Sequence, residues 1–196
     1  EIRNKMVDLG LNETLTYSLV NENESSMFTN GENESIKILS PLTEERSCLR
    51  QTLTTSLYKV YEYNKARSNE DISIFEISKA FYKNGENFIE KNRIAALMQG
   101  EYFTGLDKET VDFFVIKGIA EELLDFLGYN GRYSFVTDKA IPKDLHPGKS
   151  AMISVNNDIV GFIGRINPTI SKDEVYVMEI DLDKLLEKRV SGMKYK

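Results

Sequence analysis

The stretch DISIFEISKAFYKNGENFIEKNRIAALMQ, residues 71–99, contains two runs typical of β-strands on either side of a turn. Residues 71–82 are dominated by β-branched and aromatic side chains, which favour extended backbone. The Asn84-Gly85 pair is a turn signal, and residues 93–99 form a second apolar run. We therefore expect two strands here, joined by a connection so short that it requires antiparallel pairing.

The rest of the chain adds helices and further strands around this pair. Residues 112–127 give the clearest helix, because apolar residues follow helical spacing from Phe113 to Leu127 and Gly128 supplies a stop. Other helices are expected at 2–10, 21–28, 55–67 and 183–188, and other strands at 14–20, 35–39, 132–137 and 175–182, with a hairpin over 150–166. Many strands joined by short turns indicate an α+β fold, with helices on one face of a mainly antiparallel sheet.

Composition limits the function classes. The 196 residues include 31 acidic and 25 basic side chains, for a formal charge of −6, so average charge disfavours nucleic-acid binding by this chain alone. Cys48 is the single cysteine, which excludes an intrachain disulfide and fits a reducing cytoplasm. No signal peptide or membrane-spanning run is apparent. We expect residues 1–196 to be a single module, and both ends suggest a piece cut from a longer protein.

Most catalytic chemistry is disfavoured by the residues present. His146 is the only histidine and lies in the turn-rich LHPGKS, with no nucleophile motif nearby. We expect His146, Pro147 and Gly148 to order this loop through a bond from the ring to the backbone. One cysteine and one histidine cannot complete a structural zinc site. We therefore expect no catalytic and no metal-binding residues.

Two further patterns have structural explanations. Glu179, Asp181 and Asp183 alternate along a predicted strand, which indicates a solvated strand face more than a magnesium site. Gly161 and Gly164 lie within the predicted hairpin, where glycine relieves crowding or allows a bulge. Neither the GxxxxGK[ST] nor the GxGxxG phosphate-binding pattern occurs, so no cofactor-binding residues are expected.

A resemblance extends through nearly the whole chain. In order and spacing, several segments together resemble the catalytic-like module of the bacterial phenylalanyl-tRNA synthetase β subunit, which precedes the C-terminal anticodon-contacting domain. Two residues depart from the family's pattern. Lys149 stands after HPG, where the family usually has arginine, and Thr55 stands where a proline often opens the helix expected over 55–67. The segments are VDLGLNETLTYSLV (7–20), LSPLTEERSCLRQTLTTSLYKVYEYNKAR (39–67), IFEISKAFY (74–82), DFFVIKGIAEELLDFLGY (112–129), LHPGKSAMI (145–153), VGFIGRINP (160–168) and YVMEIDLDKL (176–185).

The resemblance implies a class II synthetase-like core without its chemistry. Active cores of this class hold ATP with two arginines, whose planar forks suit phosphate oxygens. Tyr82 stands where the first arginine is expected, and residues 78–90 contain none. The final strand and helix lack the GxGxER pattern, and Arg189 comes late. The resemblance thus implies a non-catalytic module, with ATP, Mg²⁺ and phenylalanine bound in other domains or in the other subunit of the ligase.

The same resemblance implies partners. The family pairs a catalytic α subunit with the β subunit in an (αβ)2 assembly, and tRNA contacts other domains. We expect exposed apolar side chains to mark the α-subunit contact, although the leucines among them fit the core equally well. For Arg46 and Arg50, pairing with acidic residues across the contact and pairing within the module both stay open. The candidates are Ile2, Met6, Leu9, Leu39, Pro41, Leu42, Arg46, Leu49 and Arg50.

Two alternatives stay open. One is a class II-like paralogue with a small-molecule or regulatory pocket near Glu76, Tyr82 and Arg93. The other is an RNA-binding module, which the acidic charge disfavours. In every case we expect a cytoplasmic location and no membrane partner.

Overall fold

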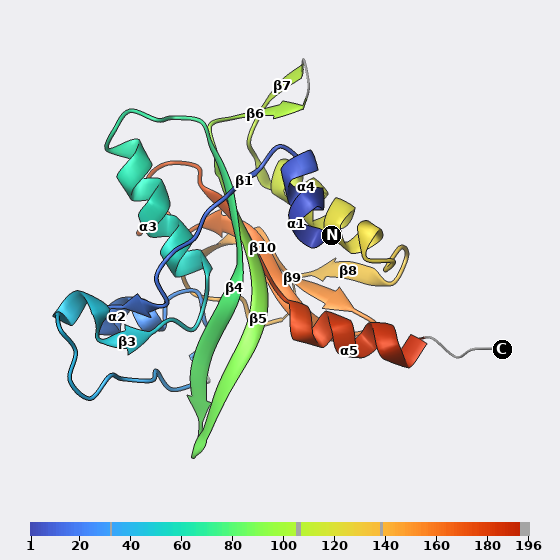
Figure 1. The fold of residues 1–196 in the computed structure, drawn as a ribbon. Helices are drawn as coiled ribbons and strands as arrows, with labels where there is room; N and C mark the ends of the chain where they lie inside the picture. Colours follow the sequence, from blue (N-terminus) through green and yellow to red (C-terminus); the bar gives the residue numbers. More distant parts are fainter. Residues whose placement is uncertain (32, 105–106, 138, 193–196) are drawn as a thin grey trace.

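A computed structural model describes residues 1–31, 33–104, 107–137 and 139–192. Across these ranges the main element is a seven-stranded sheet with the order β1-β4-β5-β11-β10-β9-β8 (Figure 1). Neighbouring strands are antiparallel except β1 and β4, which run parallel. The predicted α+β class with a mainly antiparallel sheet is confirmed. The strands are Asn12–Glu13 (β1), Ile72–Asn84 (β4), Asn87–Gln99 (β5), Tyr133–Val136 (β8), Leu145–Val155 (β9), Asp158–Ile166 (β10) and Tyr176–Asp181 (β11).

The β4–β5 hairpin is the long curved ribbon at the centre of Figure 1. Its pairing is continuous from Ile72↔Gln99 to Asn84↔Asn87. Gly85 has a φ of +59° in the turn, a conformation that glycine adopts at little cost. The strand pair predicted from residues 71–99 is therefore confirmed, and its second strand begins earlier than the apolar run alone indicated.

Helices cover both faces of the sheet. In Figure 1, α3 (Thr54–Lys65) lies on one side, whereas α1 (Ile2–Asp8), α4 (Phe113–Phe126) and α5 (Leu182–Gly192) lie on the other. The prediction that helices pack on only one face is wrong. Residues 94–98 of β5 explain why: all five side chains are fully buried, as in a strand covered on both faces.

Local capping signals explain some helix starts and not others. Asp112 caps α4 by accepting from the Phe114 and Val115 amides, and Asn21 forms a capping box with Glu24 at α2 (Glu22–Ser25). At α3 the N-cap is Leu53, which makes no side-chain cap. Instead, the carboxylate of Glu179, which is far away in the sequence, accepts from the Thr54 amide.

The β9–β10 hairpin forms as predicted and is longer than expected. Asn156 and Asn157 turn the chain with φ values of +51° and +69°, which asparagine tolerates well. A Cβ at Gly161 would lie 2.1 Å from the Glu179 carbonyl oxygen on β11, so only glycine fits there. The pairing of β10 with β9 shifts next to Gly161 and again next to Gly164. The prediction that these glycines relieve crowding or allow a bulge is confirmed.

The short strands differ most from prediction. Residues 35–39 form no strand and contribute a single bridge, Lys37↔Cys48. Residues 14–20 are strand only at β2 (Leu19–Val20), which pairs with β3 (Cys48–Leu49). The β6–β7 hairpin (Glu101–Thr104 and Asp107–Thr110), which projects at the top of Figure 1, was not predicted.

Candidate functional site

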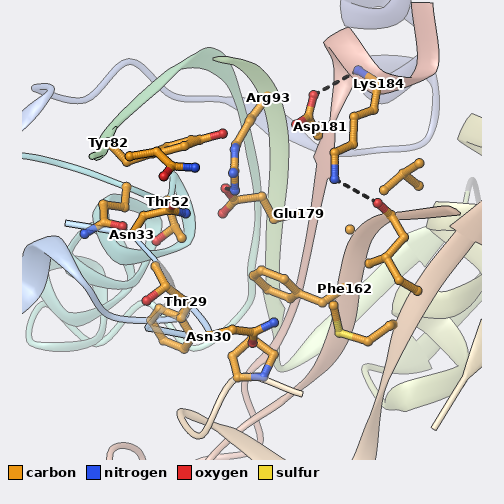
Figure 2. Close-up of a pocket in the computed structure, with 18 residues that line it drawn as sticks. Thr29, Asn30, Asn33, Thr52, Tyr82, Arg93, Phe162, Glu179, Asp181 and Lys184 are labelled. Atoms are coloured by element: carbon orange, nitrogen blue, oxygen red, sulfur yellow. Dashed lines mark hydrogen bonds and ion pairs between the residues drawn. The ribbon is translucent and has the colours of Figure 1, made fainter. Parts of the chain in front are cut away.

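A cavity of about 310 Å³ lies on the face of the sheet that carries α3. Its wall combines side chains of β4, β5, β9, β10 and β11 with residues that follow α2, among them Thr29, Asn30 and Asn33 (Figure 2). Seven of the 18 lining residues are polar and uncharged, four are charged, and the other seven are apolar, counting Gly161. The labelled residues in Figure 2 are Thr29, Asn30, Asn33, Thr52, Tyr82, Arg93, Phe162, Glu179, Asp181 and Lys184.

Glu179 on β11 is the best-connected group in this wall. It is 1% exposed, and its Oε2 accepts from the Thr54 amide at 2.9 Å and the Thr54 hydroxyl at 2.7 Å. Its Oε1 accepts from Arg93 Nη1 at 2.9 Å. The carboxylate therefore begins α3 and neutralises Arg93 at the same time, and its charge suits the positive end of the helix.

The acidic residues after Glu179 also have partners. Asp181 is 7% exposed and caps α5 by accepting from the Lys184 amide at 3.0 Å. Asp183 accepts from the backbone and side chain of Asn92, whose hydrogen bonds help to lower the pKa of that carboxyl against the opposing effect of its burial. The expectation of a solvated strand face is wrong, because an alternating acidic pattern cannot reveal partners on other elements.

Charges in the cavity balance. Arg93 and Lys184 oppose Glu179 and Asp181, so two positive charges meet two negative ones and the formal sum is zero. The Lys184 ammonium already donates to the Ile159 carbonyl oxygen at 3.1 Å. Tyr82 lines the cavity where the resemblance led us to look for an arginine. Among the described residues, the wall therefore offers no cluster of free cations to bind a triphosphate.

A second buried ion pair lies beside the cavity without lining it. Arg50 is fully buried and binds Glu76, itself 1% exposed, with Nη2 donating to Oε1 at 2.9 Å. The guanidinium also donates to Thr16, Ser56 and the Lys79 carbonyl oxygen. Arg50 is thus a core residue, and of the two pairings left open for it, across the contact or within the module, the structure shows the second. Of the three residues expected around a pocket, Tyr82 and Arg93 line this cavity and Glu76 does not.

The other candidates for a subunit contact fall into three groups. Met6 is fully buried in the core with α4, so the exposure expected of it is wrong, because this side of the otherwise exposed helix α1 packs against α4 and the sheet. Ile2, Leu9 and Leu49 are half-buried. Leu39 and Leu42 are fully exposed, at 102% and 101%, and Pro41 and Arg46 are exposed beside them.

Sequence reasoning missed two exposed apolar side chains close to these. Leu15 is 85% and Tyr17 is 70% exposed, and the Arg46 guanidinium lies 4.2 Å from the centre of the Tyr17 ring. Backbone hydrogen bonds join the stretch that ends at Val20 to residues 38–47. The Ser47 amide donates to the Val20 carbonyl oxygen, and the Ile38 amide donates to the Ser47 carbonyl oxygen. The sequence did carry a signal for this pair: Leu15 and Tyr17 are two positions apart in a predicted strand, which places both side chains on the same side.

The single histidine lies away from the cavity. The ring nitrogen Nδ1 of His146 accepts from the Gly148 amide at 3.0 Å, so the ring bonds to nearby backbone. The expected loop is not one, because residues 146–148 belong to β9, in the part where its pairing with β10 shifts, and Pro147 and Gly148 are exposed there. Among the described residues, no group of three or more His, Cys, Asp or Glu side chains is arranged to hold a metal. No helix in the described ranges is long and apolar enough to cross a membrane.

A sequence profile described as "Phenylalanyl tRNA synthetase beta chain CLM domain" matches residues 1–182. The chain belongs to this family. It is 35% identical over 195 residues to the phenylalanine–tRNA ligase β subunit of Staphylococcus saprophyticus, covering 95% of this chain and 24% of that protein. It is 34% identical over 204 residues to the same subunit of Bacillus subtilis, covering 100% of this chain and 25% of the relative. The chain thus spans about a quarter of the length of these β subunits.

The fold comparison agrees with the synthetase β-chain family. A solved pyrrolysyl-tRNA synthetase of Desulfitobacterium hafniense superposes with a TM-score of 0.70 at 15% identity, covering 97% of this chain and 68% of that one. At this identity the likeness concerns the fold alone. The fold is that of class II synthetases, as the resemblance implied.

Proposed function

We propose that this chain is a non-catalytic structural module of a phenylalanine–tRNA ligase β subunit, and that it packs against the catalytic α subunit in an (αβ)2 enzyme. The complete ligase would charge tRNA with phenylalanine in the cytoplasm, using ATP and Mg²⁺ bound elsewhere in the assembly. Contacts with tRNA would come through other domains of the β subunit.

The absence of catalysis rests on how the arginines near the cavity are used. Arg50 and Arg93 each bind a buried carboxylate of the same chain, Glu76 and Glu179. Phosphoryl oxygens need donors that are free to bind them, and a cation already paired inside the fold offers little to an incoming anion. These internal pairs support the interpretation that Tyr82 and the missing GxGxER pattern leave the module without an ATP clamp.

The packing proposal is carried by the exposed apolar segments, defined here as Leu15, Tyr17, Leu39 and Leu42. Their exposures range from 70% to 102%, and they lie in two bonded stretches of chain. Large apolar side chains gathered on a protein surface mark interaction sites, and an aromatic ring with an arginine above it is typical of an interface anchor. Burying a leucine side chain contributes about 1.5–3 kcal/mol.

The test is assembly of the β subunit that carries this module with its α subunit. Changing Leu39 and Leu42 together to serine should weaken the complex by at least about 100-fold, because about 3–6 kcal/mol of apolar burial would be lost. Size-exclusion chromatography with light scattering at micromolar concentration would report loss of the (αβ)2 species.

Phe114→Ser is the matched control, because Phe114 is also a large apolar side chain, 73% exposed, and lies on α4. The control should assemble like the unchanged protein. Full assembly of the Leu39/Leu42 double variant, or an equal defect in both variants, would contradict the proposed contact.

A further inference from the structure

Arg46 differs from the other arginines whose side chains the structure describes. Even Arg3, with a side chain that is 57% exposed, is paired with Glu13. Among the described residues, the guanidinium of Arg46 has no hydrogen bond and no ion pair, and it lies 4.2 Å from the centre of the Tyr17 ring. Its N–H groups are therefore open to a partner. The arginines that bind a carboxylate or a carbonyl oxygen of the chain are Arg3, Arg50, Arg67, Arg93, Arg132 and Arg165.

The ring of Tyr17 supports the Arg46 guanidinium from one face. Stacking on an aromatic ring favours one orientation of the planar group, so less freedom is lost when its N–H edge binds a partner. That edge matches the two oxygens of a carboxylate, which it binds through two parallel hydrogen bonds. The stacked arrangement therefore suits a carboxylate that approaches in the plane of the guanidinium.

Arg46 connects the two stretches that carry the exposed apolar segments. Residues 39–46 form a loop closed by the hydrogen bond from the Ile38 amide to the Ser47 carbonyl oxygen. From this loop, which also carries the exposed leucines, Arg46 reaches Tyr17 on the other stretch. Tyrosine and arginine are enriched among the residues that dominate binding at the centre of interfaces, where apolar neighbours exclude water. An ion pair formed here would be sheltered by the leucines, unlike a pair on the open surface.

The charges around Arg46 favour a protein partner over RNA. Glu44 and Glu45 precede it and are exposed, so residues 39–46 carry two negative charges and one positive charge. The whole chain has a formal charge of −6. Such a surface repels a chain of phosphates, which needs several cations, whereas a single carboxylate needs only one guanidinium.

We propose that Arg46, stacked on Tyr17, binds the carboxylate of an aspartate or glutamate of the α subunit within the contact. This inference rests on the proposed function and adds to it the chemistry of the partner surface, which is one carboxylate set among apolar side chains. Arg46 fixes the register of the two subunits, because an ion pair discriminates between partner surfaces, whereas the leucines contribute apolar burial.

The test compares variants of Arg46 in the full β subunit, assembled with its α subunit. Arg46→Met still covers the Tyr17 ring but removes the cation, so it should weaken assembly by at least about 30-fold, because the α-subunit carboxylate is left without its partner. Arg46→Glu should weaken assembly about tenfold more, because two carboxylates then face each other. Analytical ultracentrifugation over a dilution series measures the dissociation constant of each assembly.

Arg67→Met and Arg67→Glu are the matched controls. The Arg67 guanidinium also stacks on an exposed tyrosine, 3.4 Å from the centre of the Tyr63 ring, but lies outside the exposed apolar segments. Both controls should assemble like the unchanged protein. Urea unfolding of the Arg46 variants should match that of the unchanged protein, which separates a lost contact from a damaged fold.

The outcomes separate this inference from the assembly proposal. If the Leu39/Leu42 double variant loses assembly while both Arg46 variants keep it, the apolar contact stands and the carboxylate partner is wrong. Equal weakening by Arg46→Met and Arg46→Glu would also overturn the inference, because no acidic group would then face Arg46. Full assembly of Arg46→Glu with weaker binding of tRNA in a filter assay would identify RNA as the partner and overturn it as well.

Discussion

Two buried arginine–glutamate pairs share one face of the sheet, and they differ in how completely the fold satisfies them. Arg50 is fully buried, and its three guanidinium nitrogens donate to Glu76, Thr16, Ser56 and the Lys79 carbonyl oxygen. Arg93 keeps 20% exposure and binds Glu179 through Nη1, while Nε has no partner. The first pair is closed, whereas the second faces a cavity.

The two pairs therefore differ in role: the Arg50–Glu76 pair supports the fold alone, whereas the Arg93–Glu179 pair also borders a cavity. The Arg50 pair ties residues 16 and 50 to β4 at Glu76, and so fixes the chain segments that carry the exposed leucines and Tyr17. In the Arg93–Glu179 pair, Glu179 begins α3 by accepting from the Thr54 amide, and the Nε atom of Arg93 has no hydrogen-bond partner. Neither arginine is free to bind a polyanion, which supports the proposal that this module does not bind ATP.

The largest expected effect on stability comes from removing the cation of the Arg50–Glu76 pair. Arg50→Met keeps the length of the side chain and leaves the Glu76 carboxylate buried without its cation, so it should lower the free energy of unfolding by about 3–5 kcal/mol. Arg93→Met should cost less, about 1.5–3 kcal/mol, because Glu179 keeps both Thr54 contacts and water reaches the site. Urea unfolding measures both variants. Equal losses, or a larger loss for Arg93→Met, would contradict the distinction between the pairs.

A smaller effect is expected at a more exposed carboxylate, Asp173. The Tyr61 hydroxyl donates to it at 2.6 Å, and this bond is the main cause that lowers its pKa below the ordinary 3.8, with Lys65 adding to it. A carboxyl with a lowered folded pKa stabilises the fold above its unfolded pKa and loses that contribution as pH falls through the folded value. Tyr61→Phe should therefore cost up to about 1 kcal/mol at neutral pH, with the difference shrinking below pH 3.8.

The control for this prediction is Tyr58→Phe. The Tyr58 hydroxyl donates to the Ile170 carbonyl oxygen, which does not titrate, so its loss should be the same at every pH. Urea unfolding of both variants from neutral to acidic pH gives the comparison. A pH-independent loss in Tyr61→Phe would show that Asp173 plays no part.

Elements with a strong local pattern were predictable. The strands of residues 71–99 and the helix over 112–127 carry their periodicity and their turn or cap residues within the segment, and both formed. The cavity was only partly predictable: Tyr82 and Arg93 were expected around a pocket, but the burial of Glu179 was not. Its partner Thr54 is 125 positions away, and no local pattern reports a contact over that separation.

The burial of Arg50 and of Met6 could not be predicted from the sequence, because it depends on Glu76 and on α4 respectively. The β6–β7 hairpin was missed because Asp107–Thr110 is fully polar and exposed, without the alternation that marks a half-buried strand. Leu39 and Leu42 stayed ambiguous in the sequence, since leucine fits a core and an interface equally well, and only the structure shows them exposed.

The central claim is that the arginines on this sheet face are neutralised by the chain's own carboxylates, so that the module has no site for ATP. Isothermal titration of the protein with ATP and Mg²⁺, with and without phenylalanine, tests this most directly. The account predicts no binding heat in either titration. Micromolar ATP binding that is lost in Arg93→Met would contradict it.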